Sequence, residues 1–327
     1  MNPEFLQIIE NHQRFLLAGH ERPDGDCLGS EIAMFHLLQA LGKQATICNP
    51  DSPASSFDYF TQQTPVTSFQ AERELPEFEV MLLLDCAHLS RLGRMAGAVP
   101  SDAKIAVIDH HVGSERGDGA VSFVDATASA TGMLVARLYE HYGLTPSREA
   151  ADALFLSIVS DTGWFRYSNT TREVFAVTSR LTELGVEPSE IYDVIHRRNH
   201  RDSVAFLADS IQRCEIDLDG RFGYVVLDRA AIDRAARIGF DLDAIMEPLR
   251  SVDGIEVVAM FKENVKGTVK LSLRSQHDVD VQEIASSFGG GGHRKAAGAS
   301  LDCGLADALT SVRREVANAL RATDGGG

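Results

Sequence analysis

The sequence is short of cysteine and has no long hydrophobic run, and both shortages exclude classes of protein. The chain has 327 residues and five scattered cysteines with no C-x-x-C pair, which argues against a disulfide framework and a structural zinc site. We therefore expect a reducing, cytoplasmic location. No apolar run approaches the ~20 residues that span a bilayer, and residues 1–10 lack the layout of a signal peptide, so we expect neither export nor a membrane anchor.

Positive charge is also scarce. The chain has 31 Lys and Arg residues against 47 Asp and Glu residues, a formal net charge of −16. Such a charge repels an extended polyanion, so we expect no binding of long duplex DNA, whereas a short anionic substrate held by a few local basic groups still fits. The hydrophobic share of 44% is ordinary for folded proteins, and the length favours two domains.

The first half of the chain alternates short apolar runs with amphipathic stretches. This alternation predicts an α/β domain whose parallel sheet is connected by crossover helices. A Thr170-x-x-Glu173 pattern predicts the start of one further helix, by a capping box. We expect strands at residues 15–18, 80–84 and 104–108, and helices at residues 30–41, 129–142 and 147–160.

The second half has a different pattern, which predicts a smaller α+β domain. Asp219-Gly220 lies between two apolar runs and predicts a hairpin. We expect strands at residues 211–218, 222–227, 255–261 and 267–274, and helices at residues 229–237, 242–249, 281–288 and 305–321. The domain limits that follow are 1–187, a helical connector at 188–208, and 209–327.

Acids and histidines follow three of the predicted strands of the first half. The carboxyl ends of parallel strands are where ligands bind in open α/β sheets, so we expect these side chains to meet in one crevice. Asp161 follows a helix and is a fourth contributor. The strand ends carry His20, Asp24 and Asp26, then Asp85, then Asp109, His110 and His111.

Several carboxylates at one place repel one another unless cations neutralise them, so the pattern predicts a metal site. Carboxylate oxygens and imidazole nitrogens without thiolate suit manganese or magnesium better than zinc, and iron and cobalt also fit. There are enough ligands for two divalent ions. Two ions about 3.5–4 Å apart that share a carboxylate are a standard arrangement for attack on phosphorus.

Each residue also has a simpler interpretation when taken alone. Asp24 could stabilise a turn in Pro23-Asp24-Gly25, Asp85 could cap a helix, and Asp161 could cap a turn. His20 alone could be an ordinary histidine at a strand end. For Asp109 we favour a role in orienting a histidine through its ring N–H.

Four consecutive glycines at residues 289–292 would usually indicate a flexible linker. The adjacent His293-Arg294-Lys295 triplet argues otherwise, because glycine backbone N–H groups and nearby positive charge together bind anions. This segment does not have the context of a dinucleotide-binding fingerprint. It predicts a phosphate site.

Taken in order, these motifs resemble those of the DHH phosphoesterase superfamily. The resemblance rests on residues 20–30, Asp85, Asp109-His110-His111 and residues 160–163. It implies catalytic roles for His111, Asp85 and Asp109, with His111 facing the substrate. It also implies a first metal ion held by His20, Asp24 and Asp85, and a second held by Asp26, Asp85, His110 and Asp161.

The second half resembles the domain that accompanies many DHH proteins and carries a Gly-Gly-Gly-His signature. The resemblance implies a DHH catalytic domain, a substrate-binding domain, and an active site in the cleft between them. It implies substrate contacts from Gly290, Gly291, Gly292, His293 and Arg274, and we add Arg166 from its charge and its place after Asp161. The length and motifs are most similar to the nano-RNase branch, which implies hydrolysis of RNAs of two to four nucleotides and of 3′-phosphoadenosine 5′-phosphate to AMP, with manganese as the first choice of ion.

Other functions stay open at this stage. A phosphodiesterase acting on cyclic or linear dinucleotides would use the same metals and the same glycine loop. A manganese pyrophosphatase and the exonuclease RecJ share the first motifs but differ in their other domains. A nucleotide-binding regulator without activity is the non-enzymatic alternative, and the sequence does not decide whether the chain forms a homodimer.

Overall fold

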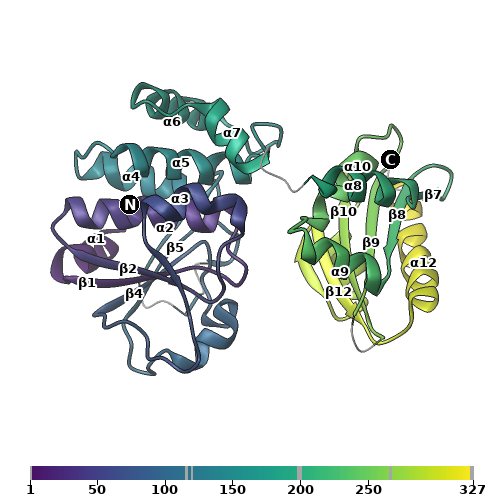
Figure 1. Cartoon of the computed structure of the whole chain (residues 1–327), viewed down its shortest axis with the longest axis horizontal. Helices are drawn as coiled ribbons and strands as arrows, with labels where there is room; N and C mark the ends of the chain where they lie inside the picture. The colour runs from purple at the N-terminus through teal and green to yellow at the C-terminus, as the bar shows by residue number, and fades with distance from the viewer. Residues whose placement is uncertain (1, 115–116, 119–120, 197–200, 265–266, 325–327) are drawn as a thin grey trace. The chain divides into compact units, whose positions relative to one another are not determined.

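The structure, a computed structural model, describes residues 2–114, 117–118, 121–196, 201–264 and 267–324. The chain divides into two compact units, residues 1–198 and residues 199–327, called unit 1 and unit 2 and described separately (Figure 1). Part of the predicted connector, residues 197–200, lies outside the described residues. The domain limits given above stay a prediction.

Unit 1 is built on a parallel sheet of six described strands in the order β3-β2-β1-β4-β5-β6. The order reverses between β1 and β4, which are neighbours in the sheet although two other strands lie between them in the sequence. The strands are β1 Arg14–Ala18, β2 Gln44–Asn49, β3 Val66–Ser68, β4 Val80–Leu84, β5 Ile105–Asp109 and β6 Val121–Val124. The α/β class and the parallel sheet predicted from the sequence are confirmed.

Helices pack mainly on one face of this sheet, as Figure 1 shows. β4 is buried along its whole length, because its side chains alternate between the helix-covered face and a second, thinner core formed with η2. Burying each of these side chains contributes about 1.5–3 kcal/mol. The helical segments are α1 Pro3–Asn11, α2 Gly25–Ala40, η1 Ser55–Phe57, α3 Asp58–Gln63, η2 Leu89–Ala98, α4 Thr131–His141, α5 Arg148–Asp161, α6 Arg172–Glu183 and α7 Pro188–His196.

Unit 2 is an α+β domain with a mixed sheet in the order β11-β12-β10-β9-β8-β7. β8 and β9 are parallel, and the other neighbouring pairs are antiparallel. The strands are β7 Glu215–Asp217, β8 Phe222–Leu227, β9 Val257–Glu263, β10 Val269–Ser275, β11 Gly291–His293 and β12 Ala296–Leu301. The smaller α+β domain predicted for the second half is confirmed.

Helices pack on both faces of the unit 2 sheet. One face packs on α11 and α12, and the other packs on α8, α9, η4 and α10. Among the described residues, no helix is both long and apolar enough to cross a membrane. The helical segments are α8 Asp202–Gln212, α9 Arg229–Arg237, η4 Leu242–Ile245, α10 Met246–Arg250, α11 Val281–Ser286 and α12 Leu305–Asp324.

Two local predictions are wrong. The strand expected at residues 211–218 is reduced to β7, because α8 continues to Gln212 and buries Ser203, Phe206 and Ser210 at helical spacing. The predicted capping box is absent, because the N-cap of α6 is Thr171, whose hydroxyl accepts from the Val174 N–H, and Glu173 therefore lies at the second helical position.

Candidate metal centre and phosphate site

The candidate metal centre of unit 1 lies where the strand order of the sheet reverses. His20, Asp24 and Asp26 follow β1, and Asp85 follows the neighbouring strand β4. Ligands bind at such reversal points in open α/β sheets, outside the carboxyl ends of the strands. His110 follows β5, and the last residue of α5 supplies Asp161, so all six predicted metal ligands converge.

Two groups of ligand atoms share Asp85. In the first group, His20 Nε2 lies 3.3 Å from Asp85 Oδ2 and 3.7 Å from Asp24 Oδ2. In the second, His110 Nε2 lies 3.0 Å from Asp161 Oδ2, 3.4 Å from Asp26 Oδ2 and 3.6 Å from Asp85 Oδ1. Asp85 therefore directs a different oxygen toward each histidine, which is the arrangement that a carboxylate shared by two ions needs. The ligand roles themselves stay a prediction.

Asp24 combines the capping role with a place in the cluster. Its Oδ1 accepts from the N–H groups of Asp26 and Cys27 and caps α2, while Oδ2 is the oxygen that faces His20. The turn interpretation and the ligand interpretation are thus compatible. Capping fixes the side chain, so its second oxygen keeps its direction.

Close packing of α2 on α5 brings Asp26 to the other acids. A Cβ at Gly29 would lie 2.4 Å from the carbonyl oxygen of Ala153, so only glycine allows this approach. The buried Asp26 carboxylate then accepts from the N–H groups of Thr131, at 2.8 Å, and Gly132, at 3.3 Å. These N–H groups begin α4, where unpaired donors and the helix dipole favour negative charge.

Asp85 has a strained backbone. Its φ of 59° lies in the left-handed region, where a residue other than glycine costs about 1–2 kcal/mol. Its N–H still donates to the Ile108 carbonyl, 3.1 Å away, so the strain is confined to the turn after β4. This turn directs the carboxylate into the cluster, and strain of this kind is concentrated at functional sites.

Asp109 organises the two histidines that follow it. Oδ1 accepts from the N–H groups of His110, at 2.7 Å, and His111, at 3.2 Å, and it lies 2.8 Å from His111 Nδ1. Oδ2 accepts from the Ser114 hydroxyl at 2.6 Å. Asp109 belongs to none of the possible metal-ligand groups among the described residues. Its geometry is that of a positioning residue, as favoured from the sequence.

In unit 2, two of the predicted substrate contacts share one row of the sheet. Arg274 on β10 pairs with Ala296 on β12, which in turn pairs with His293 on β11. Directly paired residues of antiparallel strands have their side chains on the same face. Arg274 and His293 are therefore two strands apart on one face, about 10 Å from each other.

The glycine segment of unit 2 is part of the sheet. Gly291 and Gly292 belong to the edge strand β11. A Cβ at Gly292 would lie 2.5 Å from the Ala296 carbonyl oxygen, and one at Gly290 would lie 2.2 Å from that of Gly298, so close backbone approach requires both glycines. An edge strand has unpaired N–H groups, which suits the predicted anion contacts.

Comparison with known proteins agrees with this geometry. Residues 14–158 match the DHH family N-terminal domain, and residues 236–322 match the DHHA1 domain. A protein named bifunctional oligoribonuclease and PAP phosphatase NrnA, from Thermus thermophilus, is 32% identical to this chain over 97% of it and 94% of its own length. The chain belongs to the DHH family. It is thus a phosphoesterase by family.

Two further comparisons extend over nearly the whole DHH chain. A Bacillus subtilis protein with the same NrnA name is 24% identical and covers 92% of this chain and 93% of its own. The crystal structure of an exopolyphosphatase-related protein from Bacteroides fragilis has a TM-score of 0.84 at 20% identity, covering 95% of this chain and 94% of its own. That likeness shows that the fold is shared.

The electrostatics of this DHH centre fit a metal. His20 Nδ1 lies 2.8 Å from the Glu21 carbonyl oxygen and His110 Nδ1 lies 3.2 Å from that of Ala128, so we assign the ring protons to these nitrogens. In the neutral form of each ring, the lone pair on Nε2 then faces carboxylates. His110 Nε2 is buried and makes no hydrogen bond of good geometry with a described residue. Lone pairs facing carboxylates repel unless a cation or a proton lies between them.

The pKa values of the cluster also indicate that bound positive charge stabilises it. Burial lowers the pKa of His20, but the Asp24 and Asp85 carboxylates outweigh it and raise the pKa to about 11. Burial also lowers the pKa of His110, and Asp161 with the other acids raises it to about 10. Burial raises the pKa of Asp26 well above its usual range, with Asp85 adding to the effect. Divalent ions would satisfy these groups, and the mixture of oxygen and imidazole ligands fits manganese or magnesium.

Arg166 lies in the loop after α5, five residues beyond Asp161. Its Nε donates to the Gly163 carbonyl at 2.7 Å, and its guanidinium lies 5.8 Å from the centre of the Tyr167 ring. Asn169 closes the loop by donating to the Asp161 carbonyl at 3.0 Å. A substrate contact from Arg166 stays a prediction.

Several supporting residues were missed from the sequence. Ser157 donates to Asp26, and the buried Glu31 accepts from Asn49 at 2.7 Å while Asn49 accepts from the Gly19 N–H at 3.0 Å. Gly19 directly precedes His20, so this chain of contacts fixes the end of β1. Glu31 is a charged residue within an otherwise largely apolar helix, and this was the sequence feature that could have indicated its supporting role.

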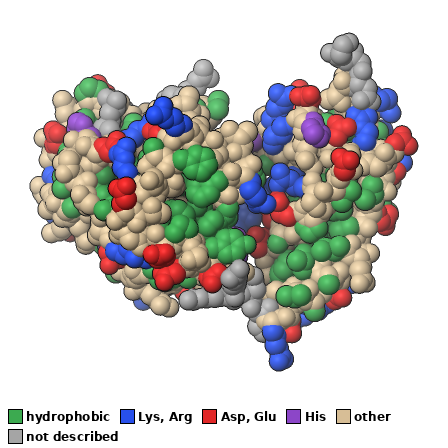
Figure 2. Space-filling view, turned by 90° about the horizontal axis from the view of Figure 1, so that it is seen from above, with side chains coloured by type: hydrophobic (Ala, Val, Ile, Leu, Met, Phe, Trp, Pro, Cys, Tyr) green, Lys and Arg blue, Asp and Glu red, His purple; other side chains and the backbone are tan. Residues whose placement is uncertain are grey.

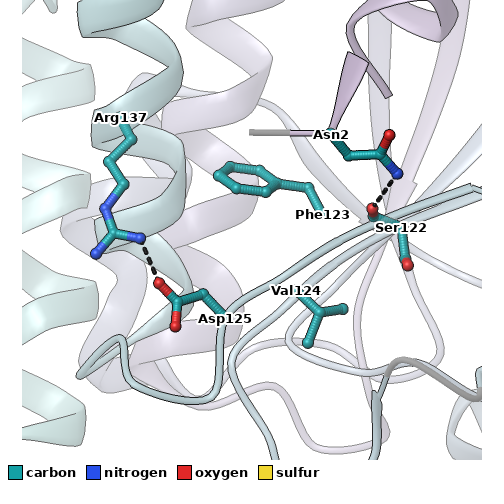
Figure 3. Close-up of a pocket in the computed structure, with 6 residues that line it drawn as sticks. All are labelled: Asn2, Ser122, Phe123, Val124, Asp125 and Arg137. Carbon is teal, nitrogen blue, oxygen red and sulfur yellow. Dashed lines mark hydrogen bonds and ion pairs between the residues drawn. The ribbon is translucent and has the colours of Figure 1, made fainter. Parts of the chain in front are cut away.

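A surface cavity of about 300 Å³ lies away from these residues, beside β6 (Figure 3). The charged groups that line it, and the Asn2 amide, are paired with one another or with nearby residues. Arg137 pairs with Asp125 at 2.6 Å and with Glu173 at 2.9 Å, and Asn2 donates to the Ser122 carbonyl at 3.0 Å. This pairing leaves no group aimed at a ligand, so the cavity is not a candidate active site.

Proposed function

We propose that this protein hydrolyses RNAs of two to four nucleotides to mononucleotides and converts 3′-phosphoadenosine 5′-phosphate (PAP) to AMP. The observation that carries the proposal is that Asp85 faces His20 with one carboxylate oxygen and His110 with the other, with Asp24 beside His20 and with Asp26 and Asp161 beside His110. The names of the Thermus and Bacillus relatives supply the substrate class, and both relatives match this chain over more than nine-tenths of its length.

The six ligand residues would hold two divalent ions, with manganese as our first choice and magnesium, cobalt or iron as alternatives. When bound, such ions activate water and stabilise the charge that develops on phosphorus. The chain itself positions the ligands. Capping fixes Asp24, the start of α4 holds Asp26, and the strained turn directs Asp85.

His111 would bind the phosphate and donate a proton to the leaving group. Asp109 accepts a hydrogen bond from His111 Nδ1. This hydrogen bond raises the pKa of His111 against the effect of burial. The same contact fixes the orientation of the ring. A raised pKa increases the share of protonated ring, which suits a residue that donates a proton.

Unit 2 would bind the nucleotide. Arg274, His293 and the backbone of residues 290–292 would contact phosphate or base, with Arg166 as a further contact from unit 1. The location of the active site in a cleft between the domains stays a prediction, as does the cytoplasmic location, for which the five free thiols are the support.

The charge of the surface supports short substrates over long ones. On the face shown in Figure 2, Lys and Arg side chains are interspersed with Asp and Glu side chains and form no continuous band. Long single strands gain affinity phosphate by phosphate along such a band. At a net charge of −16, nucleotides added beyond this short length would add little binding free energy.

A substrate panel tests the proposal. The manganese-loaded protein is incubated with PAP, with 5′-phosphorylated RNAs of two, four and about twenty nucleotides, and with cyclic di-AMP, cyclic di-GMP and pyrophosphate. We expect hydrolysis of PAP and much faster cleavage of the short RNAs than of the long one at equal strand concentration. Protein in EDTA is the control.

Each other outcome contradicts the proposal in a distinct way. Preference for a cyclic dinucleotide would assign the protein to nucleotide signalling. Faster degradation of the long strand would indicate a RecJ-like exonuclease. Absence of hydrolysis with every substrate would favour a nucleotide-binding regulator.

A further inference from the structure

One face of the unit 2 sheet is only half covered by helices. Leu271 and Leu273 of β10 and Ala297 and Ala299 of β12 belong to the core with α11 and α12. Side chains alternate along a strand, so Lys270, Ser272 and Arg274 lie on the opposite face. The buried cluster on that face takes side chains from β8 and β9, and among the described residues it takes none from β10, β11 or β12.

We call the uncovered part of this face the open half-face. It is lined by small, polar and basic residues and by no large apolar side chain among the described residues. Its residues, taken from the register of the three strands, are Lys270, Ser272 and Arg274 on β10, Ala296, Gly298 and Ser300 on β12, and Gly291 and His293 on β11.

The open half-face has two cationic ends. Arg274 and His293 lie at one end, in the same row of the sheet. Lys270 lies four residues away along β10, which is about 13 Å in an extended strand. A single phosphate cannot contact both ends, so the two ends imply two anionic groups of one ligand.

The Lys270 end contains a pair of like charges. Lys270 lies directly opposite Lys262 of β9 in the register of the sheet. Like charges in such cross-strand pairs destabilise a sheet. Lysines often protect the edge of a sheet, but β10 is an inner strand between β12 and β9, so that explanation does not apply here.

Neighbouring acids lie on the helix side of this face. Asp243 of η4 pairs with Arg274 at 2.7 Å, and Asp241, just before η4, interacts electrostatically with Lys262. Lys270 is exposed and lies between Lys262 of β9 and Ser300 of β12 in the register of the sheet. An anion bound beside Ser300 and Lys270 would offset the repulsion between the two lysines.

We propose that Lys270, with Lys262, forms a second phosphate subsite for RNAs of three or four nucleotides. Arg274 and His293 would hold one phosphate. A later phosphate of the same RNA would reach Lys270 past Ser272, which has a small side chain, and Gly298, which has none. Asp302, two residues after Ser300, has the opposite charge, so no further phosphate contact is expected beyond Lys270. This inference rests on the proposed function, whose substrates it makes more specific.

Length-dependent kinetics test the subsite. We compare Lys270→Gln, which removes the charge, with Lys270→Arg, which keeps it, on 5′-phosphorylated RNAs of two, three and four nucleotides. The matched control is Arg237→Gln, which removes an exposed charge at the end of α9 in the same unit. The readout is the ratio of kcat/KM for the tetranucleotide to that for the dinucleotide, because misfolding lowers both values together.

We expect Lys270→Gln to lower this ratio about fivefold, mainly through KM, as one exposed phosphate contact would. Lys270→Arg and Arg237→Gln should keep the ratio of the unmodified protein. For the tetranucleotide, the slope of log(kcat/KM) against log salt concentration should become shallower by about 0.7 in Lys270→Gln. An unchanged ratio and slope would overturn the subsite.

Binding measured in EDTA separates this inference from the proposed function. If the protein hydrolyses none of the RNAs but Lys270→Gln still weakens tetranucleotide binding more than dinucleotide binding, the function is wrong and the subsite stands. If the RNAs are hydrolysed and the length dependence of binding and turnover is the same in all variants, the function stands and the subsite is wrong.

Discussion

Replacing Asp85 by asparagine should stabilise the metal-free protein and abolish its response to metal. The Asp85 carboxylate is 4% exposed, and burial raises its pKa, with His20 opposing the shift and Asp24 adding to it. An acid whose pKa is raised on folding binds its proton more tightly in the folded state. Its ionisation therefore costs folding free energy, a cost that grows as the pH rises from the unfolded-state pKa through the folded-state pKa and is complete above it.

The magnitudes follow from the burial of the group and the size of unit 1. Replacing the ionised carboxylate by a neutral amide of the same shape removes this cost, while losing the contacts with His20 and His110 opposes the gain, so we expect a net gain of about 1 kcal/mol. In a unit of 198 residues each kcal/mol shifts Tm by about 2–4 °C, so the metal-free variant should melt roughly 2–4 °C higher. The unmodified protein should gain about 2.7 kcal/mol, or roughly 5–10 °C, from metal at a hundred times its Kd.

Thermal unfolding with and without manganese at neutral pH, together with metal content and PAP turnover, measures both effects. Asp85→Asn should lose turnover and the metal-dependent rise in Tm. Asp152→Asn is the matched control, because Asp152 is equally buried in unit 1 but pairs with Arg148 at 3.0 Å and with the Tyr59 hydroxyl at 2.9 Å. It should lower Tm equally with and without metal. A fully metal-loaded and active Asp85→Asn variant would refute the shared-carboxylate arrangement.

Two further predictions concern the substrate contacts and the protons of the metal centre. Arg274→Ala and His293→Ala should lower kcat/KM for nucleotides while the metal content measured by elemental analysis stays at the level of the unmodified protein, since both residues lie in unit 2; loss of metal in either variant would show that they are misassigned. Metal binding at pH 7 should release protons, because the pKa values of His20 and His110, about 11 and 10 without metal, and the raised pKa of Asp26 favour the protonated forms that a metal ion displaces. Titration calorimetry in buffers of different ionisation enthalpy measures this release, and a heat independent of the buffer would contradict it.

In unit 1 the sequence predicted the strands that are buried on both faces and missed strands that are partly exposed. β4 and β5 are continuous apolar runs, since both sides of each strand face a core. β2 has an exposed first half and β6 is a partly exposed edge strand, so neither has such a run. The ligand positions were predictable for the same reason, because they follow the recognisable strands.

The residues that hold those ligands were not predictable, because tertiary contacts alone reveal them. Ser157 and Thr131 are ordinary polar residues in the sequence, yet both donate to the buried Asp26 across more than a hundred residues of chain. The row that joins Arg274 to His293, and the pairing of Lys270 with Lys262, depend on strand register. A shift of one residue in β10 would move Lys270, Ser272 and Arg274 into the core with α11 and α12. The alternation of Leu271 and Leu273 with these polar residues therefore fixes the register, and with it the face on which every phosphate contact proposed for β10 must lie.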